Sequence, residues 1–239
     1  MKIAGITALV SGANRGIGQA FVAALRAAGA ARIYAASRDG AVAAAPGIVP
    51  LKLDVTDAGQ VAAAARTAGD VALLVNNAGV NFNTPLVGIA ALDNARREIE
   101  VNYFGTLAMC RAFAPVLKRN GGGVIVNMLS ILARVNLPLM GSLCASKAAA
   151  LSMTQGVRAE LAGQGTRVIG VMPGAVRTRM TEGLDIPKSE PADIAAAVLA
   201  GIEGDAEDLY PGEMASGVAA GLAADPKGVE KQFAAYLPG

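Results

Sequence analysis

Three glycines near the N-terminus lie where a short apolar run passes into an alanine-rich segment. Gly12, Gly16 and Gly18 follow the apolar residues 6–10 in the spacing Gly-x-x-x-Gly-x-Gly. We expect Gly12 to permit a tight turn, Gly16 to let the backbone approach a phosphate, and Gly18 to let a helix pack closely on the strand. A helix N-terminus adds amide donors and a favourable dipole. The pattern predicts a bound dinucleotide, and simple turn chemistry is the alternative.

Basic residues stand inside this turn and after the second apolar run. Ser37 and Arg38 occupy the place where a carboxylate normally receives the ribose 2′-hydroxyl, and Arg15 lies within the glycine turn. A guanidinium group suits a 2′-phosphate instead. We therefore expect NADP(H) in preference to NAD(H). The alternative is that both arginines are solvated surface charges, which are common in any fold.

Short apolar runs alternate with longer helical patterns along the chain. The predicted strands are at 6–10, 32–35, 47–53, 71–75, 124–127 and 167–171, with 208–212 as a possible last strand. The predicted helices are at 16–28, 58–68, 92–118, 142–162, 191–201 and 225–235, and Pro115 should kink or end its helix early. Such alternation predicts an α/β fold, a Rossmann-like doubly wound parallel sheet in one three-layer α/β/α domain over residues 1–239.

Composition narrows the class of protein. The 239 residues carry 21 basic and 19 acidic side chains, a net charge of +2, and no basic run is interleaved with aromatic residues, so nucleic acid binding is not expected. The two cysteines, Cys110 and Cys144, are too few for a disulfide framework, which favours a reducing cytoplasm. No stretch reaches the roughly 18 apolar residues of a membrane span. We expect no metal site.

Seven short motifs stand in an order and spacing that resemble one known family. They are the loop Ser11 to Gly18, Asp54-Val55, Asn76-Asn-Ala-Gly79, Asn102, Ser130, Lys147 and Pro173-Gly-Ala-Val-Arg-Thr178. In this order they resemble the cofactor loop, the adenine-flanking pair, the sheet-bracing asparagines, three active-site residues and the nicotinamide segment of the short-chain dehydrogenase/reductase family. The resemblance covers almost the whole chain.

The resemblance implies a role for each motif. Catalytic roles fall to Asn102, Ser130 and Lys147, together with position 143, which is Leu143 here. With the glycine turn and the arginines, the expected cofactor-binding residues are Gly12, Asn14, Arg15, Gly16, Ile17, Gly18, Ser37, Arg38, Asp54, Val55, Asn76, Ala78, Gly79, Lys147, Pro173, Gly174, Val176 and Thr178.

Leu143 departs from the family's pattern. The family's catalytic tyrosine lies four residues before the lysine, on the same helix face, and protonates the carbonyl oxygen as hydride reaches the carbon. Leucine cannot donate a proton, the chain has no histidine, and none of its 4 tyrosines precedes a lysine by four residues. Cys144 is one helical step away, so its thiol should point elsewhere. We expect Lys147 to be the remaining proton donor, directly or through water.

Three interpretations of Leu143 stay open. The first is that Leu143 is an engineered substitution in an ordinary NADPH-dependent reductase of C=O groups, which costs about 10² to 10⁴ in rate. Alternatively the chain reduces C=N bonds, because an iminium carbon needs no proton during hydride transfer. The third possibility is a dinucleotide-binding protein without turnover. A non-redox member of the fold, such as a redox-sensing regulator or a dehalogenase-type relative, fits the sequence less well.

The substrate region and the assembly are only outlined. Residues 179–190 form a short predicted lid, and the substrate-lining candidates are Ser130, Leu132, Met140, Leu143 and Met180. Met128, Leu129, Leu137 and Leu139 are further candidates, although each is as easily a core residue. Such a lining favours a small apolar or aromatic substrate. By resemblance we also expect a homodimer or homotetramer formed through the helices at 92–118 and 142–162.

Overall fold

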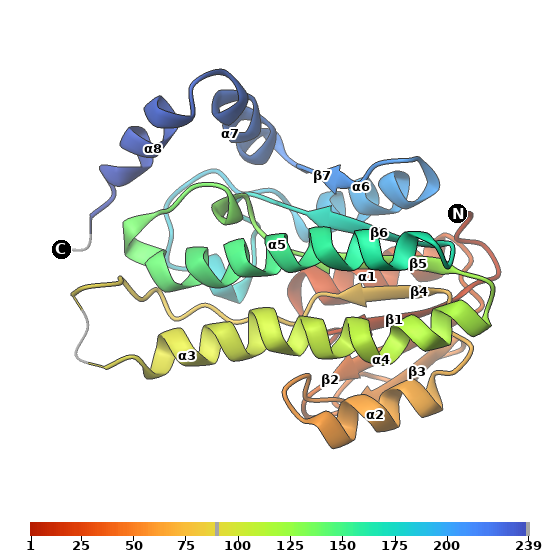
Figure 1. Ribbon diagram of the computed structural model, residues 1–239. Coiled ribbons are helices and arrows are strands. Elements are labelled where there is room, and N and C mark those ends of the chain that lie inside the picture. Colours follow the sequence, from red (N-terminus) through yellow and green to blue (C-terminus); the bar gives the residue numbers. More distant parts are fainter. Residues whose placement is uncertain (89–90, 238–239) are drawn as a thin grey trace.

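The computed structural model describes residues 1–88 and 91–237 and contains a parallel seven-stranded sheet (Figure 1). The strands are β1 (Thr7–Ser11), β2 (Arg32–Ser37), β3 (Ile48–Lys52), β4 (Leu73–Asn76), β5 (Gly123–Met128), β6 (Thr166–Val171) and β7 (Asp208–Leu209). Their order is β3-β2-β1-β4-β5-β6-β7, and every neighbouring pair runs parallel. The predicted Rossmann-like α/β class is confirmed. The order reverses between β1 and β4, where such sheets open a crevice at their carboxyl edge.

Helices cover both faces of the sheet. They are α1 (Gly16–Ala27), α2 (Ala58–Thr67), α3 (Asp93–Ile99), α4 (Thr106–Arg119), α5 (Gly141–Ala162), α6 (Pro191–Glu203), α7 (Glu213–Ala224) and α8 (Pro226–Ala234). One buried cluster joins α2, α4 and α5 to the sheet, and a second joins α1 and α6 to its other face (Figure 1). Both faces of the strands are therefore shielded from water.

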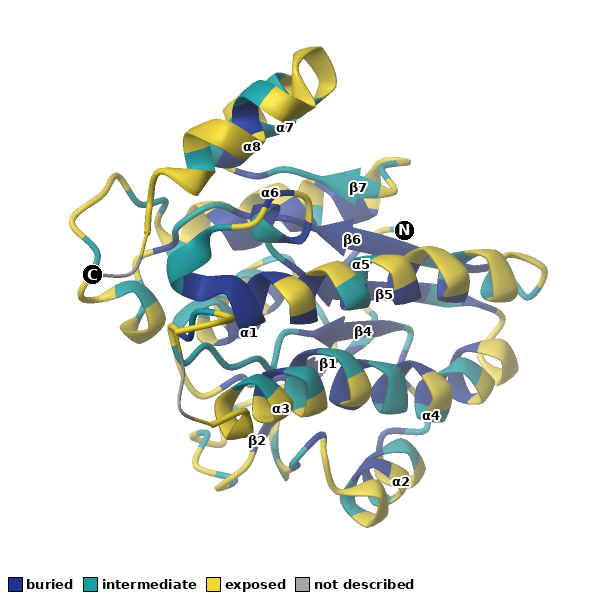
Figure 2. Cartoon of the chain, turned by 60° about the vertical axis from the view of Figure 1, so that its left-hand side comes forward, coloured by how far each residue is buried: buried dark blue, intermediate teal, exposed yellow. Residues whose placement is uncertain are grey.

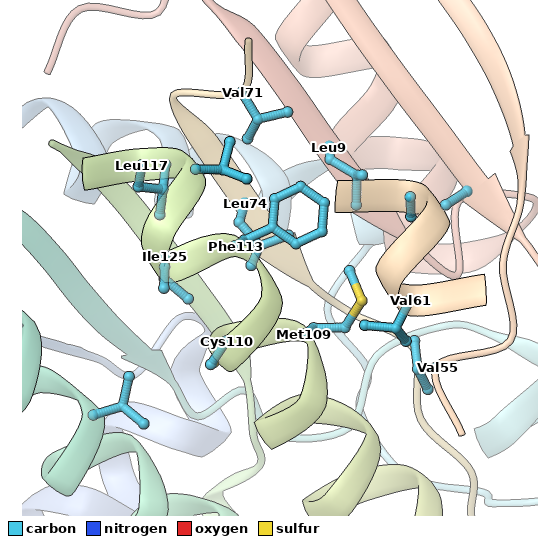
Figure 3. Packing of buried hydrophobic residues seen from close by; sticks show 14 of the residues in the cluster. Leu9, Val55, Val61, Val71, Leu74, Met109, Cys110, Phe113, Leu117 and Ile125 are labelled. Atoms are coloured by element: carbon cyan, nitrogen blue, oxygen red, sulfur yellow. The ribbon is translucent and has the colours of Figure 1, made fainter. Parts of the chain in front are cut away.

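Strand β1 shows how the two cores share one strand. Leu9 packs with the cluster under α2 and α4, whereas Ala8 and Val10 pack with the cluster under α1 and α6. Figure 3 shows Leu9 among the side chains of the first cluster, with Phe113 of α4 and Val61 of α2 close by. Successive side chains of a strand point to opposite faces, so burial on both faces requires a continuous apolar run. The dark central strands of Figure 2 reflect this burial.

The helix predicted at 92–118 is divided into three parts. A π-helical segment, Glu100–Gly105, separates α3 from α4. A Cβ atom at Gly105 would lie 2.6 Å from Val55 Cγ2, so only glycine lets the segment approach this loop closely. Of the predicted effects of Pro115, a kink or an early end of the helix, the early end is wrong, because α4 continues to Arg119. Pro115 is exposed, as is Arg111, whose carbonyl it leaves without a helical partner.

The C-terminal segment differs most from expectation. Strand β7 has only two residues, and α7 was not predicted, because its two glycines, Gly217 and Gly221, weaken the helical pattern. Helices α7 and α8 project beyond the β7 edge of the sheet (Figure 1). They bury one residue each, Ala215 and Val229. In the described ranges, no helix combines the length and hydropathy that a membrane crossing requires.

We predict that Gly18→Ala destabilises the protein. The added Cβ atom would lie 2.1 Å from the Gly12 carbonyl oxygen, so the first turn of α1 must move away from β1. Overpacking of this kind costs about 1 to 3 kcal/mol in the free energy of unfolding, which urea titration measures. Gly156→Ala, at an exposed site of α5 with open space around it, is the control and should stabilise by about 0.5 to 1 kcal/mol. Equal effects of the two changes would contradict the close approach.

Candidate active site

Two polar side chains join the carboxyl ends of β1 and β4. The Ser11 hydroxyl oxygen accepts hydrogen bonds from the backbone N–H groups of Asn77 (3.0 Å) and Ala78 (3.1 Å). In return, the Asn77 side-chain amide donates to the carbonyl oxygens of Ser11 (2.9 Å) and Gly12 (3.2 Å). Both residues belong to motifs that carry the family resemblance, the cofactor loop and the sheet-bracing asparagines, but neither was among the expected cofactor-binding residues. Together they fix the glycine turn against the segment that follows β4.

At its glycine positions the turn presents backbone alone. Gly12 and Gly16 have φ angles of +65° and +55°, a conformation that favours glycine. A Cβ atom on Gly16 would lie 3.2 Å from Thr178 Cγ2, so the segment after β6 borders the turn. Arg15, the residue before α1, makes no side-chain cap to the helix. Uncapped amides at a helix N-terminus fit a pyrophosphate group.

The end of β2 holds a carboxylate as well as the predicted cation. Ser37 is 2% exposed and donates its hydroxyl proton to Asp39 Oδ1 (2.8 Å), so Ser37 is less available to a phosphate than expected. Asp39 also accepts from the Ala41 N–H (3.0 Å), and these two bonds, the backbone one first, lower its pKa. Arg38 and Arg15 are exposed and form no ion pair within the described ranges. Asp39 was missed because it directly follows Arg38, which occupies the position expected for a carboxylate.

The predicted adenine-flanking pair lies in the turn before α2. The Asp54 carboxylate accepts from the Thr56 backbone N–H (3.0 Å) and from the Thr56 hydroxyl (2.7 Å). Val55 is 7% exposed and packs in the core cluster under α4. Both side chains thus stabilise the loop, and so does the Asp54 backbone, whose N–H donates to Gln60 Oε1 (2.9 Å) and whose carbonyl oxygen accepts from the Asp57 N–H (3.1 Å).

Asn76 points into the protein, away from the crevice. Its amide donates to Asn127 Oδ1 (2.9 Å), and the Asn127 amide donates in turn to the Thr154 hydroxyl (3.0 Å). The Asn76 Oδ1 atom is buried without a hydrogen-bond partner among the described residues. The side chain therefore braces β4 against β5 and α5. Asn76 was predicted to bind the cofactor; its side chain instead supports the strand end from which the backbone leads to Ala78 and Gly79.

Asn102 lies in the π-helical segment and holds the loop after β4. Its side chain exchanges two hydrogen bonds with Val80, accepting from the N–H (2.9 Å) and donating to the carbonyl (3.0 Å). The side-chain amide also donates to the Ser146 hydroxyl (2.9 Å), and the backbone carbonyl oxygen of Asn102 accepts from the Thr106 hydroxyl (2.9 Å). Asn102 thus connects the loop to α5 at the residue before Lys147.

Lys147 is buried on α5 and reaches the end of β5. It is 9% exposed, and its Nζ donates to the Met128 carbonyl oxygen (2.8 Å). Loss of hydration on burial lowers the pKa of Lys147 to about 8. A Cβ atom on Gly79 would lie 3.6 Å from Lys147 Nζ and 3.2 Å from Asn102 Oδ1. The structure therefore brings the predicted site residues Lys147, Asn102 and Gly79 together.

Ser130 follows β5 and caps a short 3-10 helix, Ile131–Ala133. Its hydroxyl oxygen accepts from the Leu132 N–H (3.1 Å), and the residue is half-buried. Within the described ranges its hydroxyl proton is donated to no protein acceptor. Ser130 therefore keeps a donor available for a ligand.

Leu143 lies four residues before Lys147 on α5 and is 6% exposed. It belongs to an apolar cluster with Leu132, Leu137, Leu139, Met140, Cys144 and Leu184. Three of the substrate-lining candidates thus share one cluster, whereas Met180 is 46% exposed and lies outside it. The further candidates Met128 and Leu129 pack in the two sheet cores instead.

The other possible proton donors are engaged elsewhere. The Cys144 sulfur accepts from the Leu137 N–H (3.3 Å), and burial raises the pKa of its thiol. Tyr34 donates to the Thr67 carbonyl oxygen (3.3 Å), and Tyr210 accepts from Arg134 (2.6 Å). No tyrosine hydrogen-bonds to Ser130 or Lys147 in the part of the chain that the structure describes.

The predicted nicotinamide segment follows β6. Pro173 and Val176 are buried, and Val176 bridges to Ser189. A Cβ atom on Gly174 would lie 2.9 Å from the Met214 side chain, so this glycine lets α7 approach. Thr178 borders Gly16, as described above, which places the end of the segment beside the glycine turn.

Glu98 of α3 was missed in the sequence. It is fully buried, and its carboxyl group accepts from the Phe82 N–H (2.7 Å) and from the Ser142 hydroxyl. The Ser142 N–H donates to the Thr84 carbonyl oxygen (3.2 Å). Glu98 therefore joins α3, the loop at 82–84 and the first turn of α5, one residue before Leu143. Its charged neighbours Arg96, Arg97 and Glu100 made it resemble a surface residue.

Comparison with known proteins agrees with this geometry. The family model described as short chain dehydrogenase matches residues 6–188. The chain belongs to the short-chain dehydrogenase family. It is 36% identical over 228 residues to a sorbitol dehydrogenase of Cereibacter sphaeroides, a match that covers 87% of this chain and 89% of that protein.

Solved structures of short-chain dehydrogenases superpose on the chain. One from Burkholderia cenocepacia J2315, in complex with NADP, is 48% identical with a TM-score of 0.94, covering 98% of this chain and 99% of that one. Another from Burkholderia phymatum, in complex with NAD, is 23% identical with a TM-score of 0.84, covering 97% and 96%. The second likeness shows the shared fold alone. The short-chain dehydrogenase is thus an oxidoreductase whose residues fit a dinucleotide.

We predict that Glu98→Ala destabilises the short-chain dehydrogenase by about 2 to 3 kcal/mol. The change leaves the part-buried Phe82 N–H without its acceptor and the Ser142 hydroxyl with only its longer bond to the Thr84 carbonyl oxygen (3.3 Å), and an unsatisfied buried group costs about 1 to 3 kcal/mol. Urea unfolding at constant pH measures the difference. The control is Glu160→Ala on the exposed face of α5, which should change stability by less than about 0.5 kcal/mol. A Glu98→Ala variant as stable as this control would refute the bracing role.

Proposed function

We propose that this short-chain dehydrogenase is an NADPH-dependent reductase of C=O groups in small apolar or aromatic molecules. The observation that carries the proposal is the convergence of Asn102, Lys147 and Gly79 beside the glycine turn. The NADP in the 48% identical Burkholderia cenocepacia structure supports the choice of cofactor. The exposed cations Arg15 and Arg38 would bind the 2′-phosphate.

Each side chain has a definable task in this reaction. NADPH, when bound, supplies a hydride. Ser130 would donate its free hydroxyl proton to the substrate oxygen and orient the carbonyl group. Lys147 would provide the proton that completes the alcohol, directly or through water, and its lowered pKa makes it a better acid than an exposed lysine. Asn102 positions Lys147 through Ser146 and the loop after β4.

Leu143 favours a second candidate function, the reduction of C=N bonds. Leu143 is buried in an apolar cluster, one helical turn before Lys147 on α5, at the position where we expect the family's tyrosine. An iminium carbon accepts hydride without a simultaneous proton transfer, so an apolar wall is compatible with that chemistry. The same wall would disfavour carbonyl reduction, since it replaces the general acid.

For location and assembly we propose a cytoplasmic homodimer or homotetramer formed through α4 and α5. Phe104, in the π-helical segment before α4, is 50% exposed and packs edge-on against Tyr103. Tyr103 is half-buried against the core, so Phe104 is the exposed member of the pair, and an exposed aromatic side chain favours an interface between helices.

The main experiment replaces Leu143 with tyrosine. If the chain reduces carbonyl groups, we expect Leu143→Tyr to raise the kcat for ketones with NADPH by about 10² to 10⁴, because it restores a general acid. If the chain reduces C=N bonds, activity on cyclic imines should fall instead. Both are measured from the loss of NADPH absorbance across a panel of ketones and imines.

Leu143→Phe is the matched control, because it adds the same ring without the hydroxyl. Equal effects of the phenylalanine and tyrosine variants would contradict a role for the phenol. Absence of turnover in the wild type and in Leu143→Tyr, despite NADPH binding, would contradict both catalytic proposals and leave the non-catalytic alternative.

We predict that the reduction rate falls as the pH rises through about 8. Lys147 is protonated below its pKa of about 8, so the proposed donor loses its proton above that value. The measurement is kcat against pH at saturating NADPH and substrate. Lys147→Met should lower kcat and remove this step from the profile. A wild-type rate that stays level between pH 7 and about 9.5, well above the lowered pKa of Lys147, would exclude Lys147 as the acid.

A further inference from the structure

Asn102 holds the loop after β4 at one point. Its side chain exchanges hydrogen bonds with the Val80 backbone in both directions, and its amide reaches the Ser146 hydroxyl of α5 (2.9 Å). Asn102, Val80 and Ser146 are here called the Asn102 anchor. Because Ser146 directly precedes Lys147, this anchor fixes the position of the lysine relative to the loop that contains Gly79.

Glu98 makes a second set of contacts of the same kind. Its carboxyl group accepts from the Phe82 N–H (2.7 Å) and from the Ser142 hydroxyl, and the side chain is fully buried. Glu98, Phe82 and Ser142 are here called the Glu98 anchor. Ser142 is bonded to the loop once more, since its N–H donates to the Thr84 carbonyl oxygen (3.2 Å). The loop is therefore held at residue 80 by one anchor and at residues 82–84 by the other.

The two anchors have the same spacing along the chain. Glu98 precedes Asn102 by four residues, and Ser142 precedes Ser146 by four. Residues four apart lie on one face of a helix, so the Glu98 anchor repeats the Asn102 anchor one helical turn earlier on α5. Leu143 follows Ser142 as the lysine follows Ser146. By this geometry the Glu98 anchor acts on Leu143 as the Asn102 anchor acts on the lysine.

The Glu98 anchor lies beside the apolar cluster of the site. Met140 belongs to that cluster, and the Asn81 side-chain amide of the loop donates to its sulfur (3.6 Å). A Cβ atom on Gly141, the first residue of α5, would lie 2.7 Å from Leu86 Cγ, so the loop packs directly on the start of the helix. The distance between the loop and the first turn of α5 is thus fixed on the side where the proposed function places the substrate.

We propose that Glu98 is a positioning residue for the substrate. It fixes the distance between the loop at 80–86 and the first turn of α5, and through Ser142 it fixes the apolar wall at Leu143. The inference rests on the proposed function and divides the loop between two tasks. The Asn102 anchor serves the lysine and the cofactor, whereas the Glu98 anchor serves the substrate. Glu98 acts through its neighbours, because it is fully buried.

The test compares Glu98→Ala with Glu98→Gln. Alanine releases both bonds, so Glu98→Ala should raise the KM for the substrate about tenfold or more, at an unchanged Kd for NADPH. Glutamine keeps both contacts, because its oxygen accepts from Phe82 and its amide donates to the Ser142 oxygen, whose proton turns to the Thr84 carbonyl oxygen (3.3 Å). Glu98→Gln should therefore return the KM to within about twofold of the wild type. Steady-state kinetics on the ketone and imine panel and calorimetry with NADPH measure the two constants.

Val198→Ala is the control for lost stability. Val198 of α6 is fully buried in the core cluster on the other face of the sheet, so its truncation destabilises the protein far from the loop and should leave the KM unchanged. An unchanged KM in Glu98→Ala, or an equal rise in Val198→Ala, would overturn the positioning role. A Glu98→Gln variant as impaired as Glu98→Ala would overturn it too, because charge and not spacing would then matter. An equal loss of NADPH affinity would overturn the division between the anchors.

Hydrogen exchange tests the Glu98 anchor without turnover. Compared with Val198→Ala, Glu98→Ala should speed the exchange of backbone amides in residues 80–86 and 141–147, while residues 11–18 keep their rates. Unchanged exchange in both segments would overturn the inference whatever the kinetics show. If the wild type reduces no ketone or imine, the proposed function fails together with the substrate role, and the exchange rates alone then decide whether Glu98 holds the two segments together.

Discussion

The reciprocal hydrogen bonds between Ser11 and Asn77 are the constraint on which the site depends. Parallel strands β1 and β4 end side by side, and their loops would otherwise diverge at the point where the strand order reverses. The Ser11 hydroxyl takes two N–H donors from the second loop, and Asn77 returns two bonds to the first. The glycine turn is thereby held at a fixed distance from the segment that leads to Gly79. A dinucleotide that binds here would need the glycine turn and the segment leading to Gly79 to lie on its two sides.

A second set of bonds carries this geometry to the reacting groups. The loop after Gly79 is held by Asn102, whose amide also reaches Ser146, next to Lys147 on α5. Glu98 fixes the start of the same helix through Ser142, next to Leu143. The helix that bears the lysine is thus attached at both of its chemically relevant positions. Chemistry at this site depends on buried polar bonds, because apolar packing alone tolerates small shifts of a helix.

Much of the fold could be predicted from the sequence because burial on both faces of a parallel sheet leaves a clear apolar pattern. The strands, the glycine turn and the position of Lys147 follow from local rules and from motifs with fixed spacing. The π-helical segment could not be predicted, because it depends on Gly105 meeting Val55, a contact between distant parts of the chain. Helix α7 was missed because its glycines resemble a loop.

The two acidic residues that were missed differ in their surroundings. Glu98 stands among other charged residues, and nothing local distinguishes a buried carboxylate from a solvated one, so only tertiary structure shows that Glu98 is fully buried. Asp39 is exposed and accepts a hydrogen bond from Ser37, two residues before it.

The most direct measurement of the central claim is a crystal structure of the chain grown with NADP⁺. The account predicts the pyrophosphate at the N-terminus of α1 above Gly16, the nicotinamide ribose beside Lys147 and the 2′-phosphate near Arg38. An empty crevice at saturating NADP⁺, or the dinucleotide bound away from the glycine turn, would contradict it.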